Sequence, residues 1–102
     1  MEIKLRVWDG IKFHFFNALS GLYGIIPISV DMSTGLSDKT GKEIYNGDIL
    51  IDSLGTKYKV IWDEQNARFL GVTARNTLVY VGREPASVII GNVHENENVL
   101  FS

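Results

Sequence analysis

The chain has 102 residues, of which 45% are hydrophobic and 22% charged, and ten basic and twelve acidic side chains give a formal net charge of −2 at pH 7. This length allows one domain, and the composition is that of a globular protein, which excludes wholesale disorder. Because the sequence contains no cysteine, it excludes disulfides and thiolate metal sites and is compatible with a reducing compartment.

Charge and hydropathy also limit the partners and the compartment. Basic and acidic residues alternate along the chain and never form a run of five like charges. Nothing resembles the basic stripe that gathers phosphates, so nucleic-acid binding is disfavoured. The N-terminus lacks the pattern of a signal peptide, and the longest mainly apolar stretch, Leu22 to Val30, is too short to cross a bilayer. We therefore expect a soluble, cytoplasmic protein without membrane contacts.

The first predicted element is a β-hairpin over residues 3–16. Apolar and charged side chains alternate from Ile3 to Trp8, which is the period of a half-buried strand. Asp9-Gly10 follows, a pair typical of tight turns, and residues 11–16 alternate again.

Residues 17–33 are ambiguous. Apolar side chains recur at helical spacing, but Gly21, Gly24 and the following Pro27 each disfavour a helix. The balance favours a loop with at most one short turn of helix, followed by a strand through Ile28 to Met32.

Residues 34–48 are dense in turn-forming residues. Asp38-Lys39-Thr40-Gly41 suits a type I turn closed by glycine, and Asn46-Gly47 is the strongest two-residue turn signal in the chain. Ile44 and Tyr45 lie between the two turns, and we expect these apolar residues to anchor the loop on the core.

From Asp48 onward, five apolar runs recur about every ten residues, with short polar or glycine-containing stretches between them. This spacing predicts an antiparallel meander that forms a small barrel or sandwich. Several runs are apolar on both faces, so either both faces are covered within the domain or one face meets another subunit. The runs are Ile49–Ile51, Tyr58–Trp62, Phe69–Val72, Leu78–Val81 and Val88–Val93.

The whole chain, residues 1–102, is thus expected to be a single, mainly β domain: an N-terminal β-hairpin plus a five-stranded antiparallel meander. The tail ends with the adjacent apolar residues Val99, Leu100 and Phe101. We expect this segment to dock either on the body of the domain or on a neighbouring molecule.

The stretch from Thr34 to Ile49, TGLSDKTGKEIYNGDI, resembles the signature of the YopX family of phage and prophage proteins. Three further pieces fall in the same order as in that family: Arg6–Asp9, Tyr58–Trp62 with Phe69, and Gly91–Asn96. The resemblance implies a mainly β fold, a phage or prophage setting in a host bacterium, and self-association. It carries over no catalytic residue, so it does not imply an enzyme.

The loop at residues 34–48 contains three carboxylates, Asp38, Glu43 and Asp48, which could in principle hold Ca²⁺. Their spacing matches no calcium-binding loop, and Asp and Asn side chains in such positions commonly cap backbone groups of turns. The turn-forming interpretation is favoured, and we predict no metal site.

The two histidines, His14 and His94, could form a metal or acid–base site with Glu95 or Asp9. They lie far apart in the sequence and belong to no recognisable ligand motif, so a non-catalytic role is favoured for both. Nucleophilic catalysis lacks a cysteine and a Gly-x-Ser-x-Gly turn, and no glycine-rich phosphate loop is present. We predict neither catalytic residues nor a cofactor, and we expect that the chain is not an enzyme.

Aromatic and basic residues could together form a stacking platform for single-stranded nucleic acid. The alternative, which we favour, is that the aromatic residues are core and the basic residues are a solvated face. The aromatic residues are Trp8, Trp62, Phe69 and Tyr80, and the basic residues are Lys57, Lys59, Arg68 and Arg75.

The leading hypothesis is a non-enzymatic phage accessory protein that acts through protein–protein contacts, as a homo-oligomer and with a host protein as a further candidate partner. A small β-barrel that binds nucleic acid is the second hypothesis, and a hydrolase that uses histidine and carboxylates is the third. The candidate interaction surface consists of Lys57, Lys59, Arg68, Arg75, Leu100 and Phe101.

Overall fold

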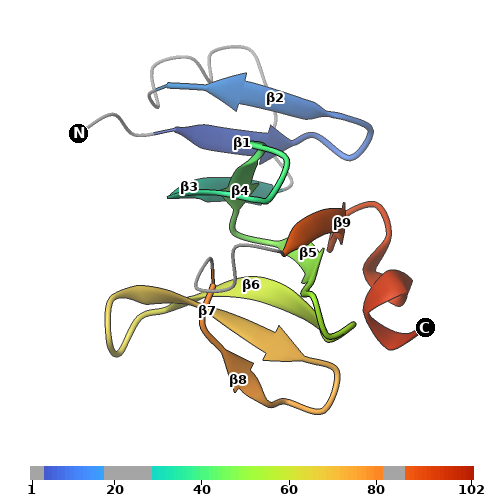
Figure 1. Cartoon of the computed structure of the whole chain (residues 1–102). Helices are drawn as coiled ribbons and strands as arrows, with labels where there is room; N and C mark the ends of the chain where they lie inside the picture. Colours follow the sequence, from blue (N-terminus) through green and yellow to red (C-terminus); the bar gives the residue numbers. More distant parts are fainter. Residues whose placement is uncertain (1–3, 18–28, 82–86) are drawn as a thin grey trace.

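The computed structural model describes residues 4–17, 29–81 and 87–102 (Figure 1). In these ranges the chain forms nine strands, arranged in two antiparallel sheets, and a short C-terminal 3-10 helix. None of the helices in these ranges is long and apolar enough to cross a membrane.

The first sheet has the strand order β2-β1-β3-β4. Its strands are β1 (Leu5–Trp8), β2 (Phe13–Phe16), β3 (Ser29–Ser37) and β4 (Glu43–Tyr45). The predicted N-terminal hairpin is confirmed as β1 and β2. Its turn is closed by the Asp9 carboxylate, which accepts hydrogen bonds from the backbone N–H groups of Ile11 and Lys12.

The second sheet has the order β8-β7-β6-β5-β9. Its strands are β5 (Asp48–Ile51), β6 (Lys57–Asp63), β7 (Arg68–Thr73), β8 (Leu78–Val79) and β9 (Val88–Asn92). They correspond to the five predicted apolar runs. The first four strands form a meander, and β9 returns to pair with β5. Since β8 and β9 are the two edges of this sheet, the described strands form a sandwich-like arrangement and not a closed barrel.

The structure differs from the expectation for residues 34–48. The two turns are present, but β3 extends to Ser37 and pairs with the short strand β4, because the chain reverses at residues 38–42 and brings the flanking segments together. The strand predicted from Ile28 to Met32 is found as β3 from Ser29 onward. The predicted loop or helical turn falls mostly on residues 18–28, which lie outside the described residues.

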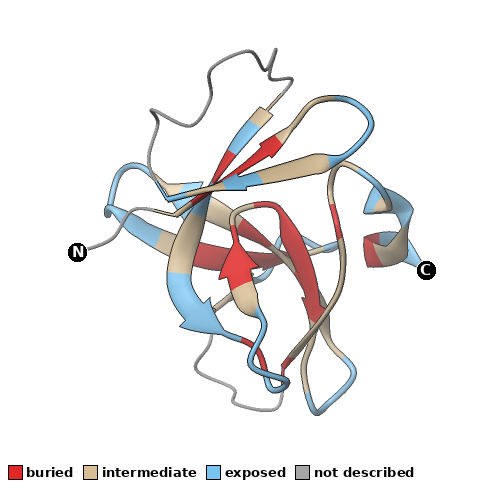
Figure 2. Cartoon of the chain, turned by 90° about the horizontal axis from the view of Figure 1, so that it is seen from above, coloured by how far each residue is buried: buried red, intermediate tan, exposed pale blue. Residues whose placement is uncertain are grey.

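The main hydrophobic cluster lies on the inner face of the second sheet. It contains Ile44, Leu50, Tyr58 and Val60. Ile44 comes from β4 of the first sheet, so this residue packs one sheet against the other. Figure 2 shows that buried residues gather in the interior between the strands, whereas the peripheral turns are exposed.

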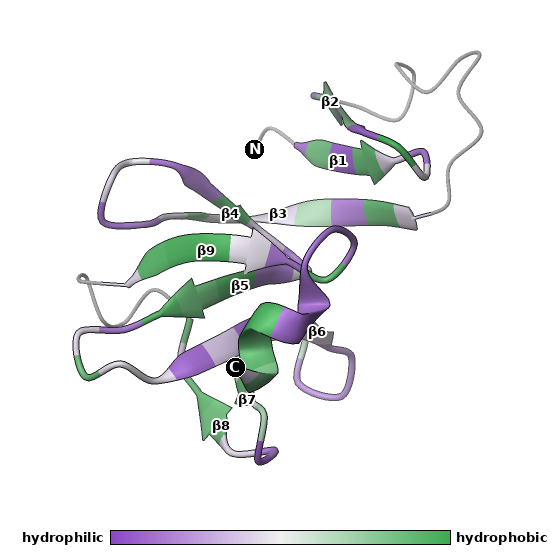
Figure 3. Ribbon diagram, turned by 90° about the vertical axis from the view of Figure 1, so that its right-hand side faces the viewer, coloured by the Kyte–Doolittle hydropathy of each residue, from purple (hydrophilic) through white to green (hydrophobic). Residues whose placement is uncertain are grey.

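The C-terminal 3-10 helix, η2 (Glu97–Phe101), packs against β5, β6 and β9 (Figure 3). Leu100 is buried there, whereas Phe101 remains exposed. The tail therefore docks on the body of the domain through Leu100.

Candidate functional site

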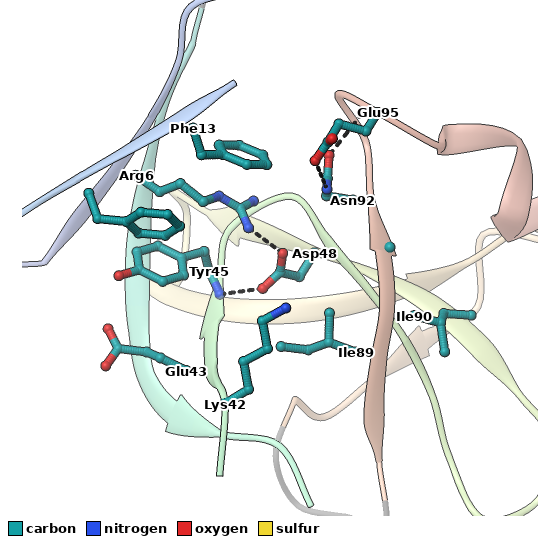
Figure 4. Close-up of a pocket in the computed structure, with 12 residues that line it drawn as sticks. Arg6, Phe13, Lys42, Glu43, Tyr45, Asp48, Ile89, Ile90, Asn92 and Glu95 are labelled. Atoms are coloured by element: carbon teal, nitrogen blue, oxygen red, sulfur yellow. Dashed lines mark hydrogen bonds and ion pairs between the residues drawn. The ribbon is translucent and has the colours of Figure 1, made fainter. Parts of the chain in front are cut away.

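A cleft of about 480 Å³ opens between the two sheets, and we call it the inter-sheet cleft (Figure 4). It is lined by three aromatic residues of the first sheet, by Ile89 and Ile90 of β9, and by a set of polar and charged side chains. The aromatic residues are Phe13, Phe15 and Tyr45, and the charged residues are Arg6, Lys42, Glu43, Asp48 and Glu95.

Arg6 lies at the floor of the cleft because it points away from its neighbours on β1, Leu5 and Val7, and toward the second sheet. Its side chain is only 6% exposed. Nε and Nη2 donate to Asp31 Oδ2 at 3.1 and 2.9 Å, and Nη1 donates to Asp48 Oδ1. Since Asp31 belongs to β3 and Asp48 to β5, one guanidinium connects the two sheets.

Aromatic rings lie on this guanidinium. Its central carbon is 4.3 Å from the ring centre of Phe13 and 5.1 Å from that of Tyr45, which places the cation in contact with both π systems. Phe15 meets Tyr45 edge to face, with ring centres 5.8 Å apart, and its side chain is largely exposed.

His94 completes the buried polar network. Its Nε2 lies 3.0 Å from Asp31 Oδ2. The ring stacks on Trp8, with ring centres 5.7 Å apart, and meets the edge of Phe13. We refer to Arg6, Asp31, Asp48 and His94 as the buried polar network.

The electrostatics of the network are unbalanced. The side chains of Asp31 and Asp48 are each 3% exposed, and they share a single guanidinium. Burial raises the pKa of Asp48 above its ordinary value, although the charge of Arg6 and the backbone N–H of Tyr45 act in the opposite direction.

Asp38 fastens the signature loop to the other sheet. Oδ1 accepts hydrogen bonds from the Thr40 hydroxyl and from the backbone N–H groups of Thr40 and Lys42, and Oδ2 accepts from the N–H of Ile89 in β9. Burial acts to raise the pKa of Asp38, but these hydrogen bonds outweigh it and hold the pKa below its ordinary value.

Gly47 allows the chain to cross from the first sheet to the second. It has φ +92°, and a Cβ there would lie 3.2 Å from Val93 Cγ2 and 3.5 Å from Arg6 Nη2. Its own N–H and carbonyl bond to Val60 and Val93, respectively. The signature glycine is therefore required both by its backbone conformation and by the close approach of its neighbours.

The three carboxylates weighed as calcium ligands have separate structural roles. Asp38 holds a turn, Glu43 pairs with Lys4 at 3.0 Å, and Asp48 bonds to Arg6. In the described part of the chain, no group of three or more histidine or acidic side chains is placed to hold a metal ion.

The two histidines do not share a site. His14 Nε2 bonds to Asp9 Oδ2 at 2.7 Å on the N-terminal hairpin, whereas His94 bonds to Asp31. The backbone N–H of Lys12, the ring of His14 and the backbone N–H of Ile11 bond to the Asp9 carboxylate and lower its pKa to about 2. Glu95 accepts a hydrogen bond from Asn92 Nδ2.

The structure brings only part of the predicted interaction surface together. A second hollow, of about 710 Å³, lies between the β7–β8 turn and the C-terminal segment. It is lined by three members of the predicted surface, Lys57, Arg75 and Leu100. Lys57 Nζ donates to the carbonyls of Val99 and Ser102 at 3.3 and 2.7 Å, so it fastens the C-terminal helix. Leu100 is buried beneath that helix.

The other members of that surface lie apart from this hollow. The strand register places Lys59 and Arg68 on the same face of the second sheet as Lys57, and Arg68 Nε lies 3.4 Å from Asp63 Oδ2. Phe101 is exposed at the end of the chain described by the structure.

The four aromatic residues of the nucleic-acid platform do not form one surface, but the expectation that they are core is wrong for Trp62 and Tyr80, which are exposed. Trp62 and Phe69 are cross-strand partners, with ring centres 4.8 Å apart, on the face of β6 opposite to Lys57 and Lys59. Trp8 belongs to the first sheet and stacks on His94.

The sequence gives little indication of the cleft. Arg6 and Asp48 occur in segments that resemble the family signature, which could have marked them, but Asp31, Phe13 and Phe15 occur in no motif. Their convergence depends on strand pairings between distant segments, such as that of β1 with β3.

The fold and the site together define a mainly β, two-sheet domain whose sheets are joined by a buried polar network. The model of the YopX protein family matches residues 22–101, and the chain therefore belongs to the YopX family. No curated protein matches the chain significantly.

Two solved structures are similar to this chain in fold. The crystal structure of protein EF1440 from Enterococcus faecalis has a TM-score of 0.66 at 20% sequence identity, covering 96% of this chain and 97% of that one. The crystal structure of protein yopX from Bacillus subtilis has a TM-score of 0.59 at 19% identity, covering 98% and 97%.

Proposed function

We propose that this chain is a non-enzymatic accessory protein of a phage or prophage, which acts through protein–protein contacts and self-associates. The observation that carries the proposal is the inter-sheet cleft, where the exposed ring of Phe15 stands beside a hollow of about 480 Å³. Exposed aromatic side chains next to a concavity are typical of contact surfaces between proteins.

The condition of the buried polar network supports a non-enzymatic role. A general acid or base must reach the proton that it transfers. Asp31 and Asp48 are almost fully buried and bonded to Arg6, and His94 Nε2 is directed at Asp31. These groups hold the two sheets together, which accounts for their presence without a reaction.

Self-association is supported by apolar side chains at an open sheet edge. β8 is an edge strand of two residues, and Leu78 and the following Tyr80 are both about 60% exposed. Exposed apolar side chains on an edge strand favour pairing with another chain.

The contact role of the cleft can be tested by affinity capture from host-cell lysate, with and without nuclease. We expect this chain to capture proteins that are still recovered after nuclease treatment. The same proteins should be lost with the variant Phe15→Ser and recovered with the variant Ile11→Ser. Ile11 is the matched control because it is 85% exposed on the same hairpin and does not line the cleft. Capture that is equal for both variants would contradict the assignment of this surface.

Self-association can be tested by sedimentation velocity over a range of protein concentrations. We expect a concentration-dependent rise in mass that Leu78→Ser abolishes and Leu54→Ser leaves unchanged, since Leu54 is exposed on the β5–β6 turn and away from β8. A monomer at every concentration would exclude self-association.

Nucleic-acid binding is a second candidate, favoured by the position of Lys57, Lys59 and Arg68 on one face of the second sheet. The separation of these residues from Trp62 and Trp8 weighs against it. Capture that disappears with nuclease, and binding that weakens steeply as salt rises, would favour this candidate over the first.

A further inference from the structure

In the buried polar network, carboxylates outnumber permanent cations. Asp31 and Asp48 are two buried carboxylates that share the guanidinium of Arg6, and Asp48 also lines the inter-sheet cleft. A buried carboxylate without a full counter-charge is destabilising, so a cation placed beside Asp48 would be favourable.

The rim of the cleft adds one further carboxylate. Glu43 and Glu95 lie on opposite walls of the cleft, as Figure 4 shows. Glu43 is paired with Lys4 at 3.0 Å, whereas Glu95 forms no ion pair within the described residues and accepts a hydrogen bond from Asn92 Nδ2. Three of the four contacts of Arg6 with oxygen are already made to the buried carboxylates, so its charge is directed inward and away from the rim.

The aromatic wall of the cleft suits a delocalised cation. Phe13 and Tyr45 already contact the guanidinium of Arg6 at 4.3 and 5.1 Å. Phe15 continues this wall outward, edge to face with Tyr45, and this residue is 64% exposed. A ring and a carboxylate on facing walls are the two groups that recognise guanidinium and ammonium groups.

We infer that the inter-sheet cleft binds a basic side chain, arginine or lysine, presented by a partner protein. The aliphatic part of that side chain packs on Phe15 and Ile89, and its charged end lies at Glu95 on the rim, attracted also by the negative charge of the buried Asp48. This inference rests on the proposed protein–protein function and specifies the chemistry of the partner, which carries an exposed basic residue at its contact surface.

Binding can be measured by NMR titration with short blocked peptides that differ at one residue: arginine, its neutral isostere citrulline, or glutamate. We expect the arginine peptide to shift the amide signals of Phe15, Tyr45 and Glu95 saturably. The citrulline peptide should bind up to about fivefold more weakly, the range of a solvent-accessible charge pair. Equal binding of the two peptides, or tighter binding of the glutamate peptide, would overturn the inference.

Charge variants give a second, independent readout. Glu95→Gln should weaken binding of the arginine peptide about twofold to fivefold, and Lys42→Gln should strengthen it by removing a competing cation. Glu64→Gln is the matched control, because Glu64 is exposed on the β6–β7 turn and does not line the cleft. An anion site would respond to Lys42→Gln in the opposite direction, so weaker binding in that variant contradicts the inference.

The outcomes separate this inference from the function on which it rests. If Phe15→Ser loses the captured proteins but the arginine peptide does not bind, the cleft is a contact surface for another chemistry and the inference fails alone. If the captured proteins are also unaffected by Phe15→Ser, the assignment of the cleft as a contact surface fails too.

Discussion

Arg6 is the residue that makes two buried carboxylates, Asp31 and Asp48, compatible with a stable fold. Its side chain is 6% exposed, and its guanidinium neutralises part of the charge on Asp31 and Asp48, whose side chains are even more buried. A buried cluster of ion pairs adds little to the stability of the fold while all its members are present. Removing one member, however, leaves the others charged in a poorly solvated site, which is strongly destabilising. The stability of the fold therefore depends strongly on Arg6.

We expect Arg6→Met to lower the free energy of unfolding by about 3–5 kcal/mol, because Asp31 and Asp48 lose their counter-charge and Phe13 loses its cation–π contact. Urea denaturation monitored by tryptophan fluorescence measures this change. Arg68→Met is the control, since Arg68 forms an exposed pair with Asp63 and should lose less than about 1 kcal/mol. Similar losses in the two variants would contradict the structural role of Arg6.

Gly47 allows the effect of a close contact to be separated from that of backbone conformation. Gly47 and Gly55 have nearly the same φ, +92° and +85°, but a Cβ at Gly55 would meet nothing within 4 Å. Gly55→Ala should therefore lower the free energy of unfolding by about 1–2 kcal/mol, the cost of placing a residue with a Cβ in the left-handed region. Gly47→Ala should lower it by clearly more, because the methyl group also meets Val93 and Arg6. Equal changes in thermal midpoint would show that Val93 and Arg6 yield to the added methyl group.

Asp38 should make stability dependent on pH. Because its folded pKa lies below the unfolded value of about 3.9, it contributes stability above that pH, and this is lost as pH falls through the folded pKa. Asp38→Asn should thus be less stable than the parent at pH 7, and the difference should shrink toward pH 3. Denaturant titrations at both pH values test this, and a constant difference would contradict it.

At the scale of the strand, β9 is an edge whose N–H groups are partly occupied. Ile89 N–H donates to Asp38 Oδ2 at 3.0 Å and Asn92 N–H donates to Asn96 Oδ1 at 2.7 Å. Gly91 permits the second contact, since a Cβ there would lie 2.6 Å from Asn96 Oδ1. Side chains from two signature segments thus protect β9 from pairing with another strand.

The β6–β7 hairpin carries Trp62, which the alternating pattern places on the same face as Tyr58 and Val60. The structure shows that Trp62 lies beyond the cluster and is 39% exposed, so a tryptophan on the core face is not necessarily in the core. We expect Trp62→Ala to fold and to lose about 1–3 kcal/mol, mostly from its contact with Phe69. Val60→Ala, within the cluster, provides the comparison, and an unfolded Trp62 variant would contradict this placement.

The sequence predicts those elements whose pattern is local. Alternation identifies β1 and β2, and regular apolar spacing identifies the strands of the second sheet. The sequence does not predict the end of β3 or the strand β4. This segment is rich in turn-forming residues, and its strand conformation depends on the pairing of β3 with β4, which no local pattern indicates. The cleft is missed because Arg6 meets partners 25 and 42 residues away, and no local pattern reports such contacts.

At the scale of the molecule, the two sheets are joined by several kinds of contact. The chain crosses between them at Gly47, Ile44 of one sheet packs in the cluster of the other, and Asp38 bonds to β9. The radius of gyration is 13.5 Å, close to the about 13 Å of a compact domain of this length. Neither sheet is therefore an independent unit.

The position of Arg6 between β3 and β5 has a consequence for how the molecule opens. A fluctuation that separates the sheets must break the bond of Arg6 to Asp48 and leave that buried carboxylate without its counter-charge, so local opening at this junction is costly. Backbone amides at the centres of β1 and β6 should then exchange with deuterium at one common rate, through a single cooperative transition. Arg6→Met should let the amides of β1 exchange faster than those of β6, because it removes one of the contacts that couple the two sheets.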